Sequence, residues 1–229
     1  LEVLFCAKPP HLYANPTTFD GVDLSPILLP DNRFMPVVDK FPYLGDIISR
    51  DGSDTEAVHA RVSAGSKAFG ALRGCVFATS EVNDTAKKAV YEAIVLSITL
   101  YGCETWSLTE SQLQRLRVMH AHHLRVMSHV SRTRMWDEHI STQELGQRLR
   151  IDSIDTSITR RQLRWLGHVA RMDFDRRLPR RMLSAWVPHP RPVGAPTMTY
   201  GRSIGKALAK FSVDGARWAE LATDRGAWR

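Results

Sequence analysis

Apolar residues recur at helical spacing along most of the chain after residue 52, and this pattern predicts a mainly α-helical fold. Capping-box patterns, in which serine or threonine precedes Glu or Gln by three residues, begin predicted helices at 53–56, 109–112 and 141–144. The first helix presents an apolar stripe that includes Gly65, where a neighbouring element can approach closely. We expect this helix and those at about 84–101 and 109–127 to form one bundle.

The first 52 residues show a different pattern, in which short apolar bursts alternate with residues that favour turns. Residues 37–38 and 43–48 are predicted as short strands, and Arg50-Asp51-Gly52 is a turn signal. The sequence therefore predicts a mainly α fold: a short N-terminal β-hairpin region, then a helical bundle, then a smaller basic helical extension. We place these three parts at 1–52, 53–130 and 131–229.

The predicted extension consists of shorter helices. A helix is expected after the capping box at 141–144, an arginine-rich helix at about 153–172, and a short helix at 179–186. Four prolines within 187–196 predict a loop or extended linker. Two further helices are expected at 200–211 and 214–228.

The arginine-rich helix is the most informative segment, because a helical projection separates its apolar and basic residues into two faces. The apolar stripe contains Ile154, Ile158, Trp165, Val169 and Met172. The neighbouring arc, which we call the arginine ridge, contains Arg160, Arg161, Arg164, His168 and Arg171, and no acidic residue falls within it. The ridge spans about 15 Å, enough to meet several consecutive phosphates. The alternative is a solvated face whose arginine stems cover the edge of a core.

Charge is divided unevenly along the chain. Residues 1–114 carry 9 basic against 14 acidic side chains, whereas residues 115–229 carry 22 against 10, so the net charge of +7 arises in the second half. Such an asymmetry indicates nucleic acid or an anionic membrane as the partner. The longest apolar run, 93–101, is too short to span a bilayer, so we favour nucleic acid and expect no membrane association.

The cysteines indicate the compartment. Cys6, Cys75 and Cys103 are odd in number and far apart, which fits a reducing, intracellular setting without a disulfide framework. Because the chain begins at Leu1 and not at Met, we expect it to be a piece of a longer protein.

Known catalytic and metal-binding patterns are missing from the sequence. The helix at 109–127 carries His120, His122 and His123, but His120 falls on the apolar face and His122 points elsewhere, so we expect no convergence on a metal. The chain contains no Asp-Asp pair, no Asp/Glu-x-Lys triplet, no phosphate-binding Gly-rich loop and no nucleophile elbow. The sequence therefore predicts no catalytic residue, metal or cofactor in this chain.

Six segments, in a fixed order, resemble the C-terminal part of non-LTR (LINE-type) retrotransposon reverse transcriptases. They are FPYLGDIISRDG (41–52), RVSAGSKAFGAL (61–72), LYGCETW (100–106), LRVM (124–127), RQLRWLGHVARM (161–172) and ATDRGAWR (222–229). Each segment is weak evidence alone, but six in sequence with sensible spacing are strong. The resemblance covers residues 1–6 and 37–229.

The resemblance implies a role in holding nucleic acid. Tyr43, Leu44 and Gly45 match the primer grip at the end of the palm, and Glu2-Val3-Leu4 matches the preceding palm segment. The bundle at 53–130 corresponds to the thumb, whose Arg61, Lys67 and Arg73 are expected to contact the duplex. The remainder corresponds to the extension that grips template RNA and target DNA, with the arginine ridge on phosphates.

The same resemblance sets the expected partners. They are an RNA–DNA hybrid or primer–template duplex and the upstream fingers–palm part of the same polyprotein, in the nucleus and cytoplasm. The family's aspartate pair lies upstream of Leu1, so only the parent polymerase would use Mg²⁺.

Several positions depart from the family pattern. Gly194-Ala195-Pro196 stands where Gly-Arg-Pro is usual, Thr199-Tyr200 replaces Arg-Trp, and His122-His123 occupies positions that are more often Arg and Cys. A C-terminal cysteine–histidine knuckle is also missing. These departures keep a second hypothesis open, that of a structural or protein-interaction helical domain descended from a retroelement.

Overall fold

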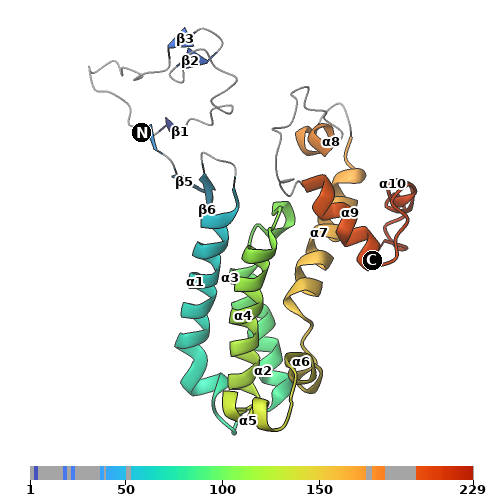
Figure 1. Ribbon diagram of the computed structural model, residues 1–229. Helices are drawn as coiled ribbons and strands as arrows, with labels where there is room; N and C mark the ends of the chain where they lie inside the picture. Colours follow the sequence, from blue (N-terminus) through green and yellow to red (C-terminus); the bar gives the residue numbers. More distant parts are fainter. Residues whose placement is uncertain are drawn as a thin grey trace. The chain divides into compact units, whose positions relative to one another are not determined.

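The computed structural model describes residues 40–49, 53–173, 177–183 and 200–228, together with the backbone of four two-residue strands. It divides into two compact units, Leu1–Ser63 and Ala64–Arg229. The described residues are mainly α-helical and a short antiparallel hairpin precedes the helices (Figure 1), which confirms the predicted fold class.

The first unit contains the strands. β1 (Val3–Leu4) pairs in parallel with β4 (Val37–Val38), and β2 (Thr18–Phe19) pairs antiparallel with β3 (Val22–Asp23). β5 (Lys40–Tyr43) and β6 (Asp46–Ser49) form an antiparallel hairpin in which Tyr43 lies opposite Asp46. The predicted strand at 37–38 is confirmed.

The prediction of one strand over 43–48 was wrong. Leu44 and Gly45 form a two-residue turn with φ of 47° and 84°, and this left-handed pair gives a hairpin loop that suits the twist of its strands. The turn could not be predicted from the sequence, because Asn or Asp is usual at the position that Leu44 occupies. The turn signal at 50–52 lies outside the described residues.

The helical bundle is built from three long segments. α1 (Thr55–Leu72) continues into the π-helical turn η2 (Arg73–Phe77). α2 (Asp84–Val90), the π-helical η3 (Tyr91–Leu96) and α3 (Ser97–Thr99) form one continuous segment, and the 3₁₀ turn η4 (Cys103–Thr105) leads to α4 (Glu110–Met127). The predicted capping box of α4 is confirmed, since Thr109 and Gln112 exchange both bonds.

Aromatic rings fill the centre of this bundle in the second unit. Phe69 of α1 stacks between Phe77, at 4.5 Å between centroids, and His123 of α4, at 3.9 Å. Tyr91 meets Phe69 and Phe77 edge-on at 6.2 and 6.1 Å. A Cβ on Gly65 would lie 2.0 Å from the Thr99 hydroxyl oxygen, which confirms the close approach predicted there.

Packing continues beyond residue 130. α5 (Arg132–Asp137) was not predicted. α6 (Thr142–Leu149) begins with the predicted capping box of Ser141 and Glu144. The arginine-rich helix is α7 (Ile154–Ala170). Both α6 and α7 pack against α4. Arg117 of α4 joins α7 directly, because its guanidinium lies 2.6 Å from the Asp155 carboxylate. The same guanidinium lies 2.5 Å from the carboxylate of Glu110.

Three short helices follow α7: α8 (Leu178–Leu183), α9 (Tyr200–Lys210) and α10 (Trp218–Leu221). Ile204 and Leu208 of α9 pack on Leu166 of α7. The helix predicted over 214–228 was too long, because the carboxylates of Asp214 and Asp224 accept bonds from nearby backbone N–H groups and so favour turns. The linker at 187–196 lies outside the described residues. None of the helices that the structure describes is long and apolar enough to cross a membrane.

Candidate nucleic-acid interface

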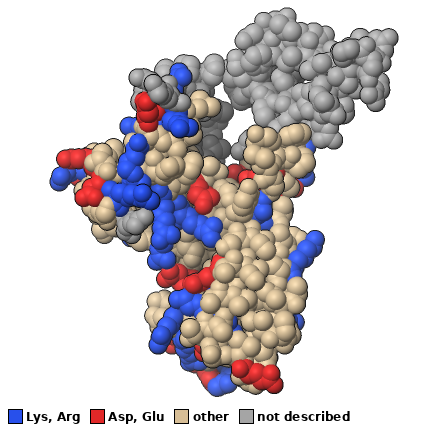
Figure 2. Space-filling model, turned by 180° about the vertical axis from the view of Figure 1, so that it is seen from behind, with Lys and Arg blue, Asp and Glu red and all other residues tan. Residues whose placement is uncertain are grey.

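The arginine ridge lies along one side of α7. Ser153 caps the N-terminus of the helix, and its hydroxyl accepts the Thr156 N–H at 3.2 Å. Arg160, Arg164, His168 and Arg171 are exposed, and their spacing of four, four and three residues aligns them on one face. Figure 2 shows Lys and Arg side chains gathered over α7 and the helices that follow it.

The buried face of α7 differs from the predicted apolar stripe. Ile154, Ile158 and Val169 of the predicted stripe are buried, but Trp165 and Met172 are only half-buried. Gln162 and Leu166 are buried in their place. Gln162 is accommodated because its side-chain amide donates to the backbone carbonyls of Trp106, at 3.0 Å, and Cys103, at 3.4 Å. A polar residue on this face therefore ties α7 to η4 and fixes the direction in which the ridge points.

The ridge residues differ in how far they are engaged. Arg160 pairs with Asp152 at 2.6 Å: no acidic residue lies within the ridge itself, but Asp152, which precedes the helix, is near enough to pair with its first arginine. Arg161 is half-buried and donates to the Leu100 carbonyl at 3.3 Å. Arg171 donates to the Ala222 carbonyl at 2.6 Å and remains exposed. Arg164 is exposed and makes no ion pair with the residues described.

The C-terminal segment holds the other side of α7. The Trp228 indole donates to the Leu163 carbonyl at 2.8 Å, and a Cβ on Gly167 would lie 2.1 Å from the indole nitrogen. Gly167 thus leaves the space that Trp228 occupies. Two of the segments that carry the family resemblance, 161–172 and 222–229, meet at this contact.

The first unit contributes the hairpin turn. Tyr43 and Leu44 are 54% and 75% exposed, and Arg61 of α1 donates to the Gly45 carbonyl. Lys40 pairs with Glu56 at 2.9 Å. Four of the predicted site residues, Tyr43, Leu44, Gly45 and Arg61, are thus brought together. Leu44 is unusual because a bulky side chain seldom adopts a positive φ, and such strain is often found at functional positions.

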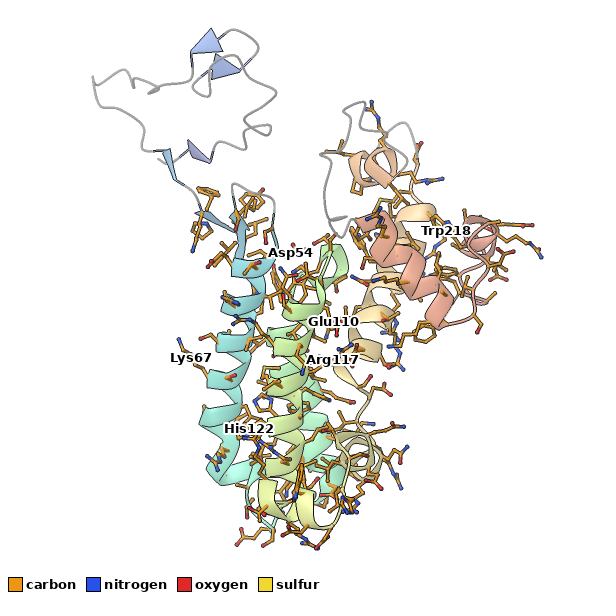
Figure 3. All side chains as sticks on the ribbon, in the orientation of Figure 1. Asp54, Lys67, Glu110, Arg117, His122 and Trp218 are labelled. Atoms are coloured by element: carbon orange, nitrogen blue, oxygen red, sulfur yellow. The ribbon has the colours of Figure 1, made fainter. Side chains whose placement is uncertain are left out.

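Lys67 and Arg73 are exposed but lie apart from the arginine ridge within the second unit. Lys67 projects outward from α1 on the side opposite α4 (Figure 3). Burial lowers the pKa of His122 most, and the charges of Arg125 and then of Arg73, which lies in η2, lower it further. His122 also contacts Arg125 at 3.2 Å, a basic group that sequence reasoning did not identify.

Two histidines of α4 converge on the Tyr91 hydroxyl, a contact that the sequence did not predict. The Tyr91 hydroxyl lies 2.9 Å from Nδ1 of His120 and 3.2 Å from Nδ1 of His123, because these histidines are one helical turn apart. Burial lowers the pKa of His120 to about 4 and that of His123 to about 3. His122 is exposed and points away, as predicted. Among the described residues no group of three His, Cys, Asp or Glu side chains is placed to hold a metal ion.

Comparisons with known proteins give one similarity. The chain is 26% identical over 197 residues to a transposon-derived protein of Caenorhabditis elegans, a match that covers 83% of this chain and 69% of that protein. No protein-family model matches the chain, and neither does any solved structure. The similarity is consistent with a transposon origin.

Proposed function

We propose that this chain is the primer-grip, thumb and C-terminal extension of a non-LTR retrotransposon reverse transcriptase, and that it binds nucleic acid. The observation that carries the proposal is the exposed row of Arg160, Arg164, His168 and Arg171 on α7. Its support is the order of the family-like segments and the similarity to a transposon-derived protein.

The mechanism is backbone recognition. Guanidinium groups in line along a helix meet successive phosphates of one strand, and each contact releases a condensed counterion. The Trp165 and His168 rings, whose centroids are 5.5 Å apart, lie next to the arginines, so a base could stack there. Affinity is then strongly dependent on salt and largely independent of base sequence.

The hairpin has a separate part in this proposal. The exposed turn at Leu44 supports the primer terminus, and Arg61 fixes the turn by binding the Gly45 carbonyl. The thumb follows the minor groove of an A-form hybrid, where shape and sugar hydroxyls are read more than sequence. Polymerisation, with its Mg²⁺ ions, belongs to the fingers–palm part of the parent protein.

Fluorescence anisotropy tests the proposal. A labelled RNA–DNA hybrid, duplex DNA and single-stranded RNA of equal length are titrated with the chain over a series of salt concentrations. We expect tight, salt-dependent binding with preference for the hybrid. Weak binding that is equal for all three polyanions would refute the proposal.

A second function, a protein-interaction or structural domain, has one observation in its favour. Arg160 and Arg171 bind Asp152 and the Ala222 carbonyl within the chain, so part of the basic charge serves internal contacts. Tight binding to a protein partner without binding to any of the three nucleic acids would favour this function.

A further inference from the structure

A cavity of about 910 Å³ lies between α4, α6 and the start of α7. Sites for small organic ligands usually measure roughly 300–1,000 Å³. Its lining combines apolar side chains, namely Val118, Leu124 and Ile151, with the amides of Gln114, Gln143 and Gln147. Flat apolar surface beside several amides suits a planar ring with hydrogen-bonding groups on its edges.

His120 adds a buried polar group to the lining. Its side chain is 3% exposed, and Nδ1 is turned to the Tyr91 hydroxyl at 2.9 Å. Nε2, on the opposite edge of the ring, is itself buried; burial lowers the pKa of His120, and a backbone hydrogen bond at Asp152 opposes this. His120 therefore fixes the wall of the cavity beside Asp152.

Two helices also begin at the cavity. Thr142 and Gln143 of α6 and Ile154 and Asp155 of α7 belong to first turns, whose peptide N–H groups have no partner within the helix. Burial by itself would raise the pKa of Asp155, but the hydrogen bonds and charge of Arg117 outweigh it and hold that pKa below its usual value. The Asp155 carboxylate is thus neutralised by Arg117, and the glutamine amides of the lining can both donate and accept hydrogen bonds.

The cavity adjoins the arginine ridge. Asp152 lines the cavity and binds Arg160, the first residue of the ridge, at 2.6 Å. Arg150, also in the lining, is exposed. A strand whose phosphates follow the ridge toward the start of α7 therefore reaches the cavity.

We propose that this cavity receives the base of one unpaired nucleotide, in a strand whose phosphates lie on the arginine ridge. The ring packs against Val118, Leu124 and Ile151, and the amides of Gln114, Gln143 and Gln147 bind its edge. Arg150 binds the adjoining phosphate. This inference rests on the proposed function and adds to it a preference for strands with an unpaired base.

Three labelled hybrids test the inference in the wild-type chain: one fully paired, one with an extra unpaired adenosine in the RNA strand, and one with an abasic residue in its place. We expect the unpaired adenosine to strengthen binding about tenfold over the abasic residue, the size of effect seen for stacked bases. Free adenosine monophosphate is titrated separately, with the side-chain amide resonances of Gln143 and Gln147 as the readout, to distinguish a nucleotide in a strand from a free one.

A matched pair of variants locates the effect. Ala121 is half-buried in the lining, so Ala121→Phe fills the cavity, whereas Ala89→Phe adds the same ring to an exposed position on α2. Only Ala121→Phe should remove the adenosine preference, with thermal melting as the check on folding. Equal affinity for the adenosine and abasic hybrids in the wild-type chain overturns the inference. If the fully paired hybrid still binds with salt dependence, the proposed function survives that result.

Discussion

The Tyr91 hydroxyl and the two histidines around it form a polar centre inside an otherwise apolar bundle. His120 and His123 are 3% and 2% exposed, and burial keeps both neutral at physiological pH because it disfavours the charged form. Phe69 and Phe77 surround the same group. These side chains hold α1, η3 and α4 together, so their protonation affects the whole bundle.

The free energy of unfolding should therefore depend on pH. In the unfolded chain each histidine titrates near 6.5, whereas burial lowers the pKa of His120 to about 4 and of His123 to about 3 in the folded protein. As pH falls below 6.5 the unfolded chain binds protons that the folded protein excludes, so the free energy of unfolding decreases. The limit is about 1.4 kcal/mol per pH unit for each histidine.

Urea denaturation between about pH 7.5 and 4.5 measures this dependence. His123→Phe keeps the stacking on Phe69 and removes one titrating group, so the slope below pH 6.5 should fall by about half. His139→Asn, which removes an exposed histidine at a position with φ of 51°, is the matched control. A wild-type stability that does not vary with pH would show that the pair is not buried in its neutral form.

Glycines on α1 offer a second test at the residue scale. Gly65→Ala places a methyl group 2.0 Å from the Thr99 hydroxyl oxygen and should destabilise the protein by about 1–3 kcal/mol. Gly70→Ala, on the same helix with nothing within 4 Å, should stabilise it by about 0.5–1 kcal/mol. Opposite signs in urea denaturation are expected, and equal effects would contradict the packing of α1 against α3.

At the scale of elements, α7 shows what the sequence could and could not predict. Its limits, its N-terminal cap and its exposed arginines follow from local signals at Ser153 and from helical periodicity. The burial of Gln162 could not be predicted, because its partners are carbonyls at Trp106 and Cys103, which the fold alone brings near. The convergence of His120 and His123 on Tyr91 likewise depends on tertiary contacts, whereas the Arg160–Asp152 pair joins residues only eight apart in the sequence.

The hairpin turn can be tested by separating backbone strain from side-chain function. Leu44→Asn places a residue that tolerates positive φ at this position, so stability should rise by about 0.5–1 kcal/mol. If the exposed Leu44 side chain supports a primer terminus, affinity for a hybrid with a recessed primer end should nevertheless fall several-fold. Ile48→Thr removes another exposed apolar side chain from β6 and serves as the control. A Leu44→Asn chain that binds as tightly as wild type would exclude the turn from the interface.

At the scale of the whole molecule, the two halves of the chain carry opposite net charge. The second half has 22 basic against 10 acidic side chains, and Figure 2 shows basic side chains concentrated over α7 and the following helices. A field of one sign attracts polyanions and raises their rate of association. We accordingly expect binding without catalysis from this chain.

Primer extension tests that expectation directly. The sequence contains no Asp-Asp pair to hold a two-metal centre, so the chain with Mg²⁺, deoxynucleotides and a primed RNA template should extend no primer. The same sample should shift the template in a binding assay. Metal-dependent extension would show that the chain holds a catalytic centre and would contradict this expectation.

The measurement that tests the central claim most directly is the salt dependence of hybrid binding in a ridge variant. Arg160, Arg164 and Arg171 are replaced together by Ala, and Arg161 is left because it is half-buried on the Leu100 carbonyl. The control replaces Arg115, Arg132 and Arg148 together by Ala. These residues are also exposed, and their replacement removes the same charge at positions outside α7. We predict that the ridge variant lowers the slope of log affinity against log salt by about 2–3 units and the control by less than about 1. Equal slopes for wild type and the ridge variant would contradict the account.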